Sequence, residues 1–172
     1  ERCLELIRDL PEPRVLDVGV GSGAIALAIA DEHPGARVTG VDTSPAALEL
    51  ARENAARLGL PVELREGGVE TAAEGWELVV SNPPYVLAEE LARLEPEVRH
   101  WEPRAALLDA GQTEALVDAA RRGLAGGGWL VLETHEHRAH EVAGFLREAT
   151  FVSVSISRDL AGRERMVEGR IG

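Results

Sequence analysis

Residues 14–30 read RVLDVGVGSGAIALAIA. A short apolar run meets a glycine-rich turn, and an alanine-rich apolar segment follows at once. This order predicts a buried strand, a tight turn and a helix. Glycines at such a turn let a ligand approach the backbone closely, and the start of the helix offers it unpaired N–H groups. The stretch therefore predicts the opening unit of a doubly wound α/β fold, with a ligand at its first turn.

The rest of the chain repeats this alternation of strands and helices. Ser44 and Pro45 suit the start of a helix, and Gly59 suits its end. Residues 151–171 suit a hairpin that turns near Ala161. Strands are expected at 14–19, 36–42, 61–66, 76–81 and 126–133, and helices at 23–32, 44–58, 112–124 and 136–149. The pattern predicts a mostly parallel seven-stranded sheet with helices on both faces. The hairpin adds one antiparallel strand at or near an edge.

The composition fits one globular domain spanning residues 1–172, with 45% hydrophobic residues. The formal net charge is −12, and phosphates repel an acidic surface, so a nucleic acid partner is not expected. No apolar run reaches the ~20 residues of a membrane span, and no basic, apolar leader opens the chain. Cys3 alone cannot form an internal disulfide, which suits a reducing compartment. We therefore expect a cytoplasmic protein with no membrane partner.

Two cofactors fit the glycine-rich turn. Gly19, Gly21 and Ala24 satisfy the dinucleotide pattern G-x-G-x-x-G/A, which favours NAD. Asp17 and Gly23 extend the turn to D-x-G-x-G-x-G. This longer pattern resembles motif I of class I methyltransferases, whose cofactor is S-adenosylmethionine. The alternative is a tight strand–helix turn that needs glycine for its shape alone.

Asp42 ends the second expected strand, about where a carboxylate would take both ribose hydroxyls of a cofactor. NAD and S-adenosylmethionine both carry such a ribose. Asp42 therefore indicates a cofactor without choosing between the two. Alternatively, Asp42 caps the helix that begins beside Ser44.

The stretch SNPPYV, residues 81–86, follows the fourth expected strand, which should lie beside the first. Asn82 would point an amide oxygen into the crevice, and Tyr85 would add a flat ring. Pro83 and Pro84 have no N–H, so the loop is rich in acceptors. Such a site suits a planar –NH₂ group on an amide or a nucleic acid base, although a rigid turn would use the same prolines. Residues 83–111 form the least regular part of the chain, as functional loops often do.

Four stretches resemble the bacterial release-factor glutamine methyltransferases, the HemK/PrmC family. They are RVLDVGVGSGAIALAIA, VSNPPYV, PEVRHWEPRAAL and DLAGRERMVEGR, and the likeness runs over nearly the whole chain. The pattern [DN]PP[YF] alone marks methyltransferases that act on nitrogen. The stretch after it, with Glu102 and Pro103, is more specific to the family.

The resemblance implies a Rossmann-like class I methyltransferase fold in the α/β class. It implies methyl transfer from S-adenosylmethionine to the side-chain amide nitrogen (N5) of the glutamine in the GGQ motif of class 1 peptide chain release factors. No metal is implied. The glutamine would be held by Asn82, Pro83, Pro84 and Tyr85. The cofactor would be contacted by Asp17, Gly19, Val20, Gly21, Ser22, Gly23, Asp42, Val69 and Asn82.

The sequence departs from the family in three places. Gly68 stands where relatives usually carry an aspartate near the adenine, with Val69 beside the ring. DAGQTEAL replaces the usual run GG-x-x-G-L. The chain starts about a dozen residues before the first strand, whereas the family normally has an additional N-terminal helical domain that helps to grip the release factor.

Two other functions stay open. A methyltransferase for exocyclic nitrogens of DNA or RNA would use the same chemistry but needs a basic tract. A non-catalytic cofactor-binding subunit would retain the fold alone. His135, His137 and His140 are interpreted as a solvated helix start, because their spacing lacks the H-E-x-x-H pattern of a metal site.

Overall fold

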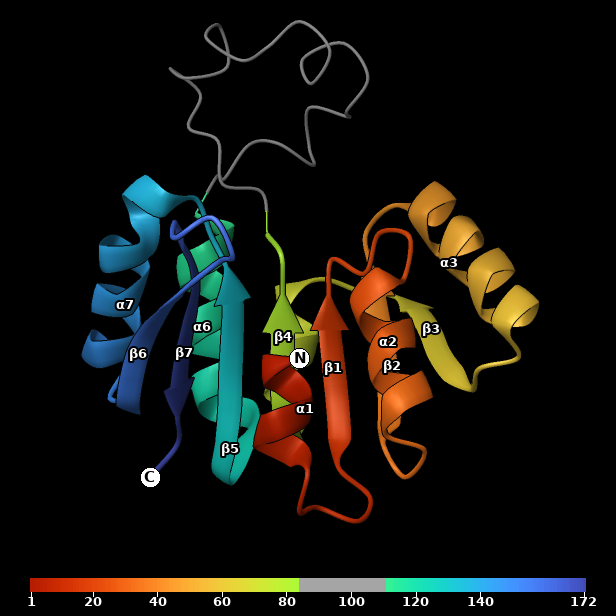
Figure 1. Cartoon of the computed structure of the whole chain (residues 1–172), viewed down its shortest axis with the longest axis horizontal. Helices are drawn as coiled ribbons and strands as arrows, with labels where there is room; N and C mark the ends of the chain where they lie inside the picture. The colour runs from red at the N-terminus through yellow and green to blue at the C-terminus, as the bar shows by residue number, and fades with distance from the viewer. Residues whose placement is uncertain (84–110) are drawn as a thin grey trace, which may run out of the picture.

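Seven strands form one sheet in the computed structural model of this chain, which describes residues 1–83 and 111–172 (Figure 1). The spatial order is β3-β2-β1-β4-β5-β7-β6. The first five strands run parallel, and β7 runs antiparallel to both β5 and β6. The strands are β1 Arg14–Val18, β2 Arg37–Asp42, β3 Val62–Glu66, β4 Trp76–Ser81, β5 Leu124–Glu133, β6 Val152–Arg158 and β7 Glu164–Arg170. The predicted sheet is confirmed, including the antiparallel strand near one edge and the place of β4 beside β1.

Helices cover both faces of the sheet, as predicted (Figure 1). They are α1 Arg2–Ile7, α2 Ala24–Glu32, α3 Pro45–Leu58, α6 Gln112–Gly123 and α7 Ala139–Glu148, with single 3₁₀ turns η1 Val69–Ala73 and η3 Glu136–Arg138. Helices α1, α2 and α3 pack with Val15, Leu78 and Val131 on one face. Helices α6 and α7 pack with Leu16 and Leu130 on the other. None of the helices in these two ranges is both long and apolar enough to cross a membrane.

Local signals set the bounds of α3 as expected. Ser44 caps the helix by accepting the backbone N–H of Ala47 at 3.3 Å, and Pro45 is the first helical residue. Gly59 ends the helix. A proline fits the first turn because its missing N–H would have no helical partner there.

Three elements differ from the sequence-based expectation. Neither α1 nor η1 was predicted, because six and five residues give too little periodicity to identify a helix. Ile7 nevertheless brings α1 into the core, with no exposed surface. Strand β5 begins at Leu124 rather than 126, and the glycines read as a turn lie inside it. At Gly128 a Cβ would lie only 3.0–3.1 Å from backbone oxygens, including those of Trp76 and Glu77 on β4, so glycine permits close strand approach.

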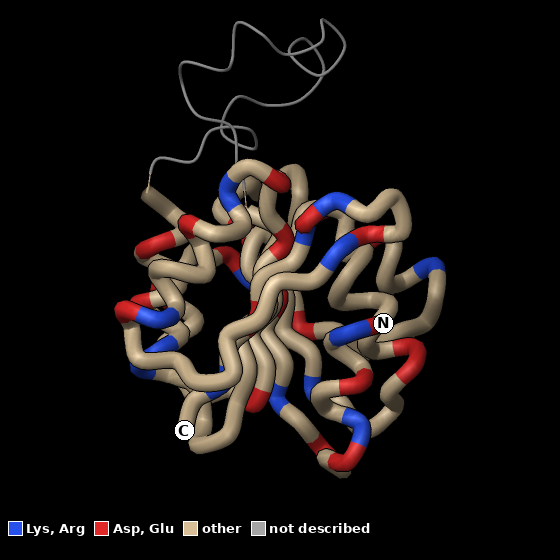
Figure 2. The backbone as a smooth tube through the Cα atoms, turned by 60° about the vertical axis from the view of Figure 1, so that its left-hand side comes forward, with Lys and Arg blue, Asp and Glu red and all other residues tan. Residues whose placement is uncertain are grey.

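Charged residues of both signs are spread along the chain. Figure 2 shows arginines interspersed with aspartates and glutamates on the tube. Many lie in pairs, such as Arg37 with Glu12 and Arg163 with Asp159. Within residues 1–83 and 111–172, the excess acidic residues are therefore not concentrated in one helix or strand.

Candidate functional site

The predicted site residues leave the sheet at one edge, where β1, β2, β3 and β4 all end. In the parallel ladders Val18 lies opposite both Val41 and Ser81, and Asp42 lies opposite Glu66. The residues that follow each strand therefore emerge side by side, at the top of Figure 1. The structure brings together Gly19 to Gly23, Asp42, Val69, Asn82 and Pro83. Ligands of open α/β sheets bind at this carboxyl edge.

Backbone hydrogen bonds attach the glycine-rich turn to the end of β2. The N–H groups of Gly19 and Val20 both donate to the Val41 carbonyl at 2.9 Å, and the Gly23 N–H donates to the Val20 carbonyl at 2.8 Å. Gly19 and Gly21 have φ angles of +74° and +55°, which L side chains rarely adopt. Among the described residues, a Cβ at Gly19 would meet no atom within 4 Å, and at Gly21 only a backbone oxygen at 3.9 Å. Within residues 1–83 and 111–172, the space above the turn is therefore open to a ligand.

Asp17 lies beneath this turn and is 1% exposed. Its Oδ2 accepts the backbone N–H of Ala26, in the first turn of α2, at 3.0 Å. The residue at the N-cap, Gly23, has no side chain that could do so. Burial raises the pKa of Asp17 to about 7, the charge of Asp42 adds to this, and the Ala26 N–H opposes it. In this structure the carboxylate faces the start of the helix.

Asp42 links the glycine turn to the start of α3. Its Oδ2 accepts the N–H of Gly21 at 3.0 Å, and its Oδ1 accepts the N–H of Ser44 at 2.9 Å. One carboxylate therefore holds both the glycine turn and Ser44, the residue that caps α3. Each carboxylate oxygen has a second lone pair, so acceptor capacity remains for hydroxyl groups.

The residues after β3 border the same edge. Gly68 donates its N–H to Oε1 of Glu70 at 2.7 Å. A Cβ at Gly68 would lie 2.7 Å from Oε2 of Glu70, so this carboxylate takes the space that a side chain at 68 would need. Val69 begins η1 and packs, half-buried, against the core on the α6 side.

Asn82 directly follows the last residue of β4 and therefore lies at this edge. Ser81 is 2% exposed, and its hydroxyl donates to the Val18 carbonyl at 2.6 Å. Asn82 is exposed, and Pro83 is buried. Pro84 and Tyr85, and Glu102 in the stretch that follows, lie outside the described residues.

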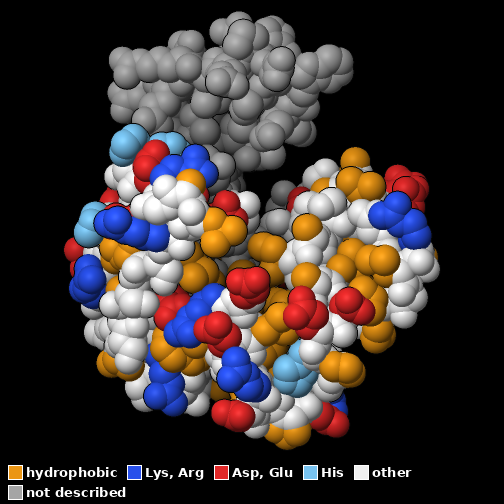
Figure 3. Space-filling model, viewed as in Figure 1, with side chains coloured by type: hydrophobic (Ala, Val, Ile, Leu, Met, Phe, Trp, Pro, Cys, Tyr) orange, Lys and Arg blue, Asp and Glu red, His pale blue; other side chains and the backbone are white. Residues whose placement is uncertain are grey.

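A cavity of about 670 Å³ opens beside the end of β4. Ser81 and Ala24 border it, Leu4 of α1 and Met166 of β7 lie in its wall, and Arg165 lies near the hairpin turn. On the face shown in Figure 3, hydrophobic side chains lie among charged ones below the notch at this edge. The glycine turn does not line this cavity, which therefore adjoins the turn on the side of β4 and β5.

Three residues that support the site were not singled out from the sequence. Ser81 ties β4 to β1, and Asn54 of α3 donates its side-chain N–H to the Ser22 carbonyl at 2.9 Å. Gly40 lies in β2, where a Cβ would be 2.6 Å from a methyl group of Val20. The glycine inside the strand pattern ARVTGVD is a signal of such close approach.

The histidines after β5 gather no metal ligands. The rings of His135 and His137 lie 5.0 Å apart, and Nε2 of His140 lies 3.3 Å from Glu164. Across residues 1–83 and 111–172, no group of three or more histidine, cysteine, aspartate or glutamate side chains is placed to hold a metal.

Comparison with known proteins identifies the family. Residues 3–95 match the family model described as methyltransferase small domain, and since this is more than half of the chain, the chain belongs to that family. It is 43% identical over 98% of its length to a release factor glutamine methyltransferase of Geobacter sulfurreducens, and 44% identical over 98% to one of Deinococcus radiodurans. It spans 62% of the length of each of these relatives.

A solved structure agrees on the fold. The apo form of the S-adenosylmethionine-dependent methyltransferase SibL superposes with a TM-score of 0.65 at 24% identity, covering 92% of this chain and 50% of that one. At this identity the likeness concerns the fold alone. The expected Rossmann-like class I methyltransferase fold is confirmed. The family match and the similarity to methyltransferases support S-adenosylmethionine as the cofactor.

Proposed function

We propose that this member of the methyltransferase small domain family transfers a methyl group from S-adenosylmethionine to the side-chain amide nitrogen (N5) of the glutamine in the GGQ motif of class 1 peptide chain release factors. The observation that carries the proposal is the meeting of the open glycine turn and Asn82 at one sheet edge. The likeness to two release factor glutamine methyltransferases supports this choice of substrate. Residues 1–172 would form the catalytic domain, and this substrate implies a cytoplasmic location.

The residues at the edge fit the proposed cofactor. The open space above Gly19 and Gly21 would receive its chain, and the free lone pairs of Asp42 would accept its ribose hydroxyls. Val69 offers an apolar surface for the adenine ring. Asp17 would act through the start of α2, and Val20, Ser22 and Gly23 would complete the turn. When bound, the cofactor supplies a methyl group on a positively charged sulfur.

Asn82 would orient the acceptor amide. An amide nitrogen is a poor nucleophile, because its lone pair is delocalised into the carbonyl group. The Asn82 oxygen accepts an N–H of that amide, which aligns the nitrogen and stabilises positive charge as the N–C bond forms and the S–C bond breaks. The proton leaves the methylated nitrogen for water. Pro83 and Pro84 contribute no donors to compete for this oxygen, and Tyr85 would pack against the amide plane.

Labelled S-adenosylmethionine tests the substrate. The chain is offered a purified class 1 release factor, the same factor with its GGQ glutamine replaced by alanine, and bulk RNA. We expect label on the unaltered release factor only, with one added methyl group on the GGQ peptide by mass spectrometry. Label on RNA would favour the nucleic acid methyltransferase, and binding of cofactor without transfer to any acceptor would favour a non-catalytic subunit.

A further inference from the structure

The end of β4 is fastened to the end of β1 by a side chain. The Ser81 hydroxyl donates to the Val18 carbonyl at 2.6 Å, between residues 63 positions apart in sequence. Each of these residues is the last of its strand, and each immediately precedes a part of the proposed site: Gly19 follows Val18, and Asn82 follows Ser81. We propose that Ser81 is a positioning residue, which sets Asn82 at its working distance from the glycine turn. This inference rests on the proposed function.

The two chain segments part directly after this bond. The β1–β4 ladder ends at the pair Val18–Ser81. Beyond it the N–H groups of Gly19 and Val20 turn to the Val41 carbonyl of β2, on the far side from β4. Pro83 has no N–H with which to extend the ladder. The Ser81 hydroxyl therefore lies at the fork, the point after Val18 and Ser81 where the two segments separate. The glycine turn proposed to bind the cofactor leads away from one side, and Asn82 from the other.

The hydrogen bond between Ser81 and Val18 is shielded from water. Ser81 is 2% exposed and Val18 is 5% exposed, so water competes little for either group. A buried carbonyl with a lost partner favours local rearrangement that regains one. Asn82 is exposed, so little packing opposes its displacement. Loss of the hydroxyl is therefore expected to displace Asn82 more than the core of the sheet.

Methyl transfer needs the acceptor nitrogen in line with the methyl group, and a misplacement of ~1 Å can cost about 10²-fold in rate. Asn82 orients the acceptor and supplies one of the proposed cofactor contacts, whereas the glycine turn and Asp42 supply the others. An error confined to the ends of β1 and β4 thus lowers kcat far more than it weakens cofactor binding.

The test compares Ser81→Ala, Ser81→Thr and a control. Ser81→Ala removes the hydroxyl, and Ser81→Thr retains it. Thr39→Val is the matched control, because Thr39 is 5% exposed on the neighbouring β2 and its hydroxyl donates to Glu63 Oε2 at 3.3 Å, away from the fork. We expect Ser81→Ala to lower kcat about 10–100-fold with less than a twofold change in the cofactor Kd. Ser81→Thr should recover most of the rate, and Thr39→Val should leave it within about twofold of the parent.

Hydrogen exchange measures how readily the backbone of the segment opens, without relying on activity. Ser81→Ala should speed exchange in the peptide spanning residues 76–83, and Thr39→Val should not. Unchanged exchange there, or a kcat equal to that of the parent, would overturn the role of Ser81. Equal losses of kcat in Ser81→Ala and Thr39→Val would overturn it too, since any buried hydroxyl would then suffice. If the parent methylates no release factor, the proposed function fails, and the exchange result still decides whether Ser81 fixes this strand end.

Discussion

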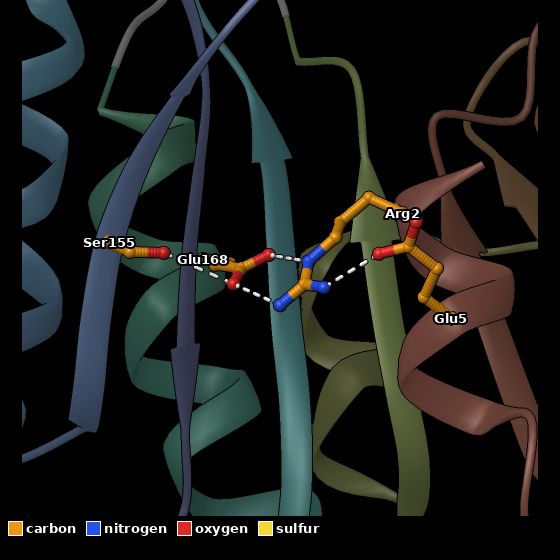
Figure 4. Close-up of polar contacts among 4 residues, drawn as sticks. All are labelled: Arg2, Glu5, Ser155 and Glu168. Carbon is orange, nitrogen blue, oxygen red and sulfur yellow. Dashed lines mark hydrogen bonds and ion pairs between the residues drawn. The ribbon is translucent and has the colours of Figure 1, made fainter.

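Arg2 binds Glu168 through two parallel hydrogen bonds, from Nε to Oε2 and from Nη2 to Oε1, both 2.8 Å long (Figure 4). The first helix is thereby joined to β7, the penultimate strand of the sheet. Glu168 is 4% exposed and also accepts the Ser155 hydroxyl at 3.1 Å. The third guanidinium nitrogen of Arg2 donates to Glu5 within α1 at 2.7 Å. The pair fixes α1 in the wall of the cavity beside β4.

Removal of Arg2 is expected to destabilise the fold. Arg2→Ala leaves a buried carboxylate whose remaining hydrogen-bond partner, among the described residues, is the Ser155 hydroxyl. Breaking a buried ion pair costs about 3–5 kcal/mol, but the Arg2 side chain is 38% exposed and solvent screens part of this. We expect a loss of about 1–3 kcal/mol of unfolding free energy, measured by urea denaturation.

Arg37→Ala is the control for this prediction. Arg37 pairs with Glu12 on the surface, with both side chains more than 60% exposed, so the expected loss is below about 1 kcal/mol. Glu168→Gln added to Arg2→Ala should restore part of the stability, since no buried charge remains. Equal effects of Arg2→Ala and Arg37→Ala would show that burial of Glu168 does not matter.

Asp17 should make stability depend on pH. Its folded pKa of about 7 lies above the ordinary value near 3.9. Between these values the folded chain binds a proton that the unfolded chain does not. The stability that this group contributes is therefore full below pH ~4 and is lost as pH rises toward ~7, by at most about 1.4 kcal/mol per pH unit.

Asp17→Asn removes this dependence while it keeps an acceptor for the Ala26 N–H. Relative to the parent, the variant should gain stability steadily from pH 5 to 7 in urea titrations, with no further gain above about pH 8. Asp159→Asn is the control. The N–H groups of Arg163 and Ala161 hold the pKa of Asp159 below its usual range, so its effect on stability changes only at acidic pH. Parallel curves for Asp17→Asn and the parent would contradict an Asp17 pKa near 7.

The centre of the sheet followed from the sequence, because β1, β2 and β4 are short, largely apolar runs that end at or next to glycine, aspartate or asparagine. The gathering of Gly19, Asp42 and Asn82 followed as well, since the carboxyl ends of parallel strands share one edge. The bond of Ser81 to Val18 did not follow. It joins residues 63 apart and depends on the register of β4 against β1, which hydrophobic patterning does not determine. The hydrogen bond from the Ala26 N–H to Asp17 was likewise not predictable from the sequence, because it depends on the backbone conformation of the glycine turn.

Asp42 is expected to govern cofactor affinity. Asp42→Ala removes the acceptors proposed for the ribose and the bond that holds the Gly21 N–H. We expect binding of S-adenosylmethionine or S-adenosylhomocysteine to weaken by about 1–3 kcal/mol in calorimetry, the range for losing charge-assisted hydrogen bonds. Asp31→Ala, on the exposed side of α2, serves as the control. In the parent both ligands should raise Tm and NAD should not. Stabilisation by NAD alone would contradict the proposed cofactor.

Asn82→Ala is expected to separate methyl transfer from binding. The variant loses the acceptor that is proposed to act as charge develops on the substrate nitrogen, and loss of one such preorganised group costs about 10²–10³ in rate. The fold should persist because Asn82 is exposed. The cofactor Kd should change far less than the rate, because Asn82 is one of several contacts proposed for the cofactor and the glycine turn is held separately by β2. Tyr85→Ala should cost less, since it removes packing and leaves the acceptor in place. Mass spectrometry of the GGQ peptide over time gives the rate for each variant. A folded Asn82→Ala variant that binds cofactor and methylates at the parent rate would remove Asn82 from the reaction and leave the acceptor amide to be oriented by another group.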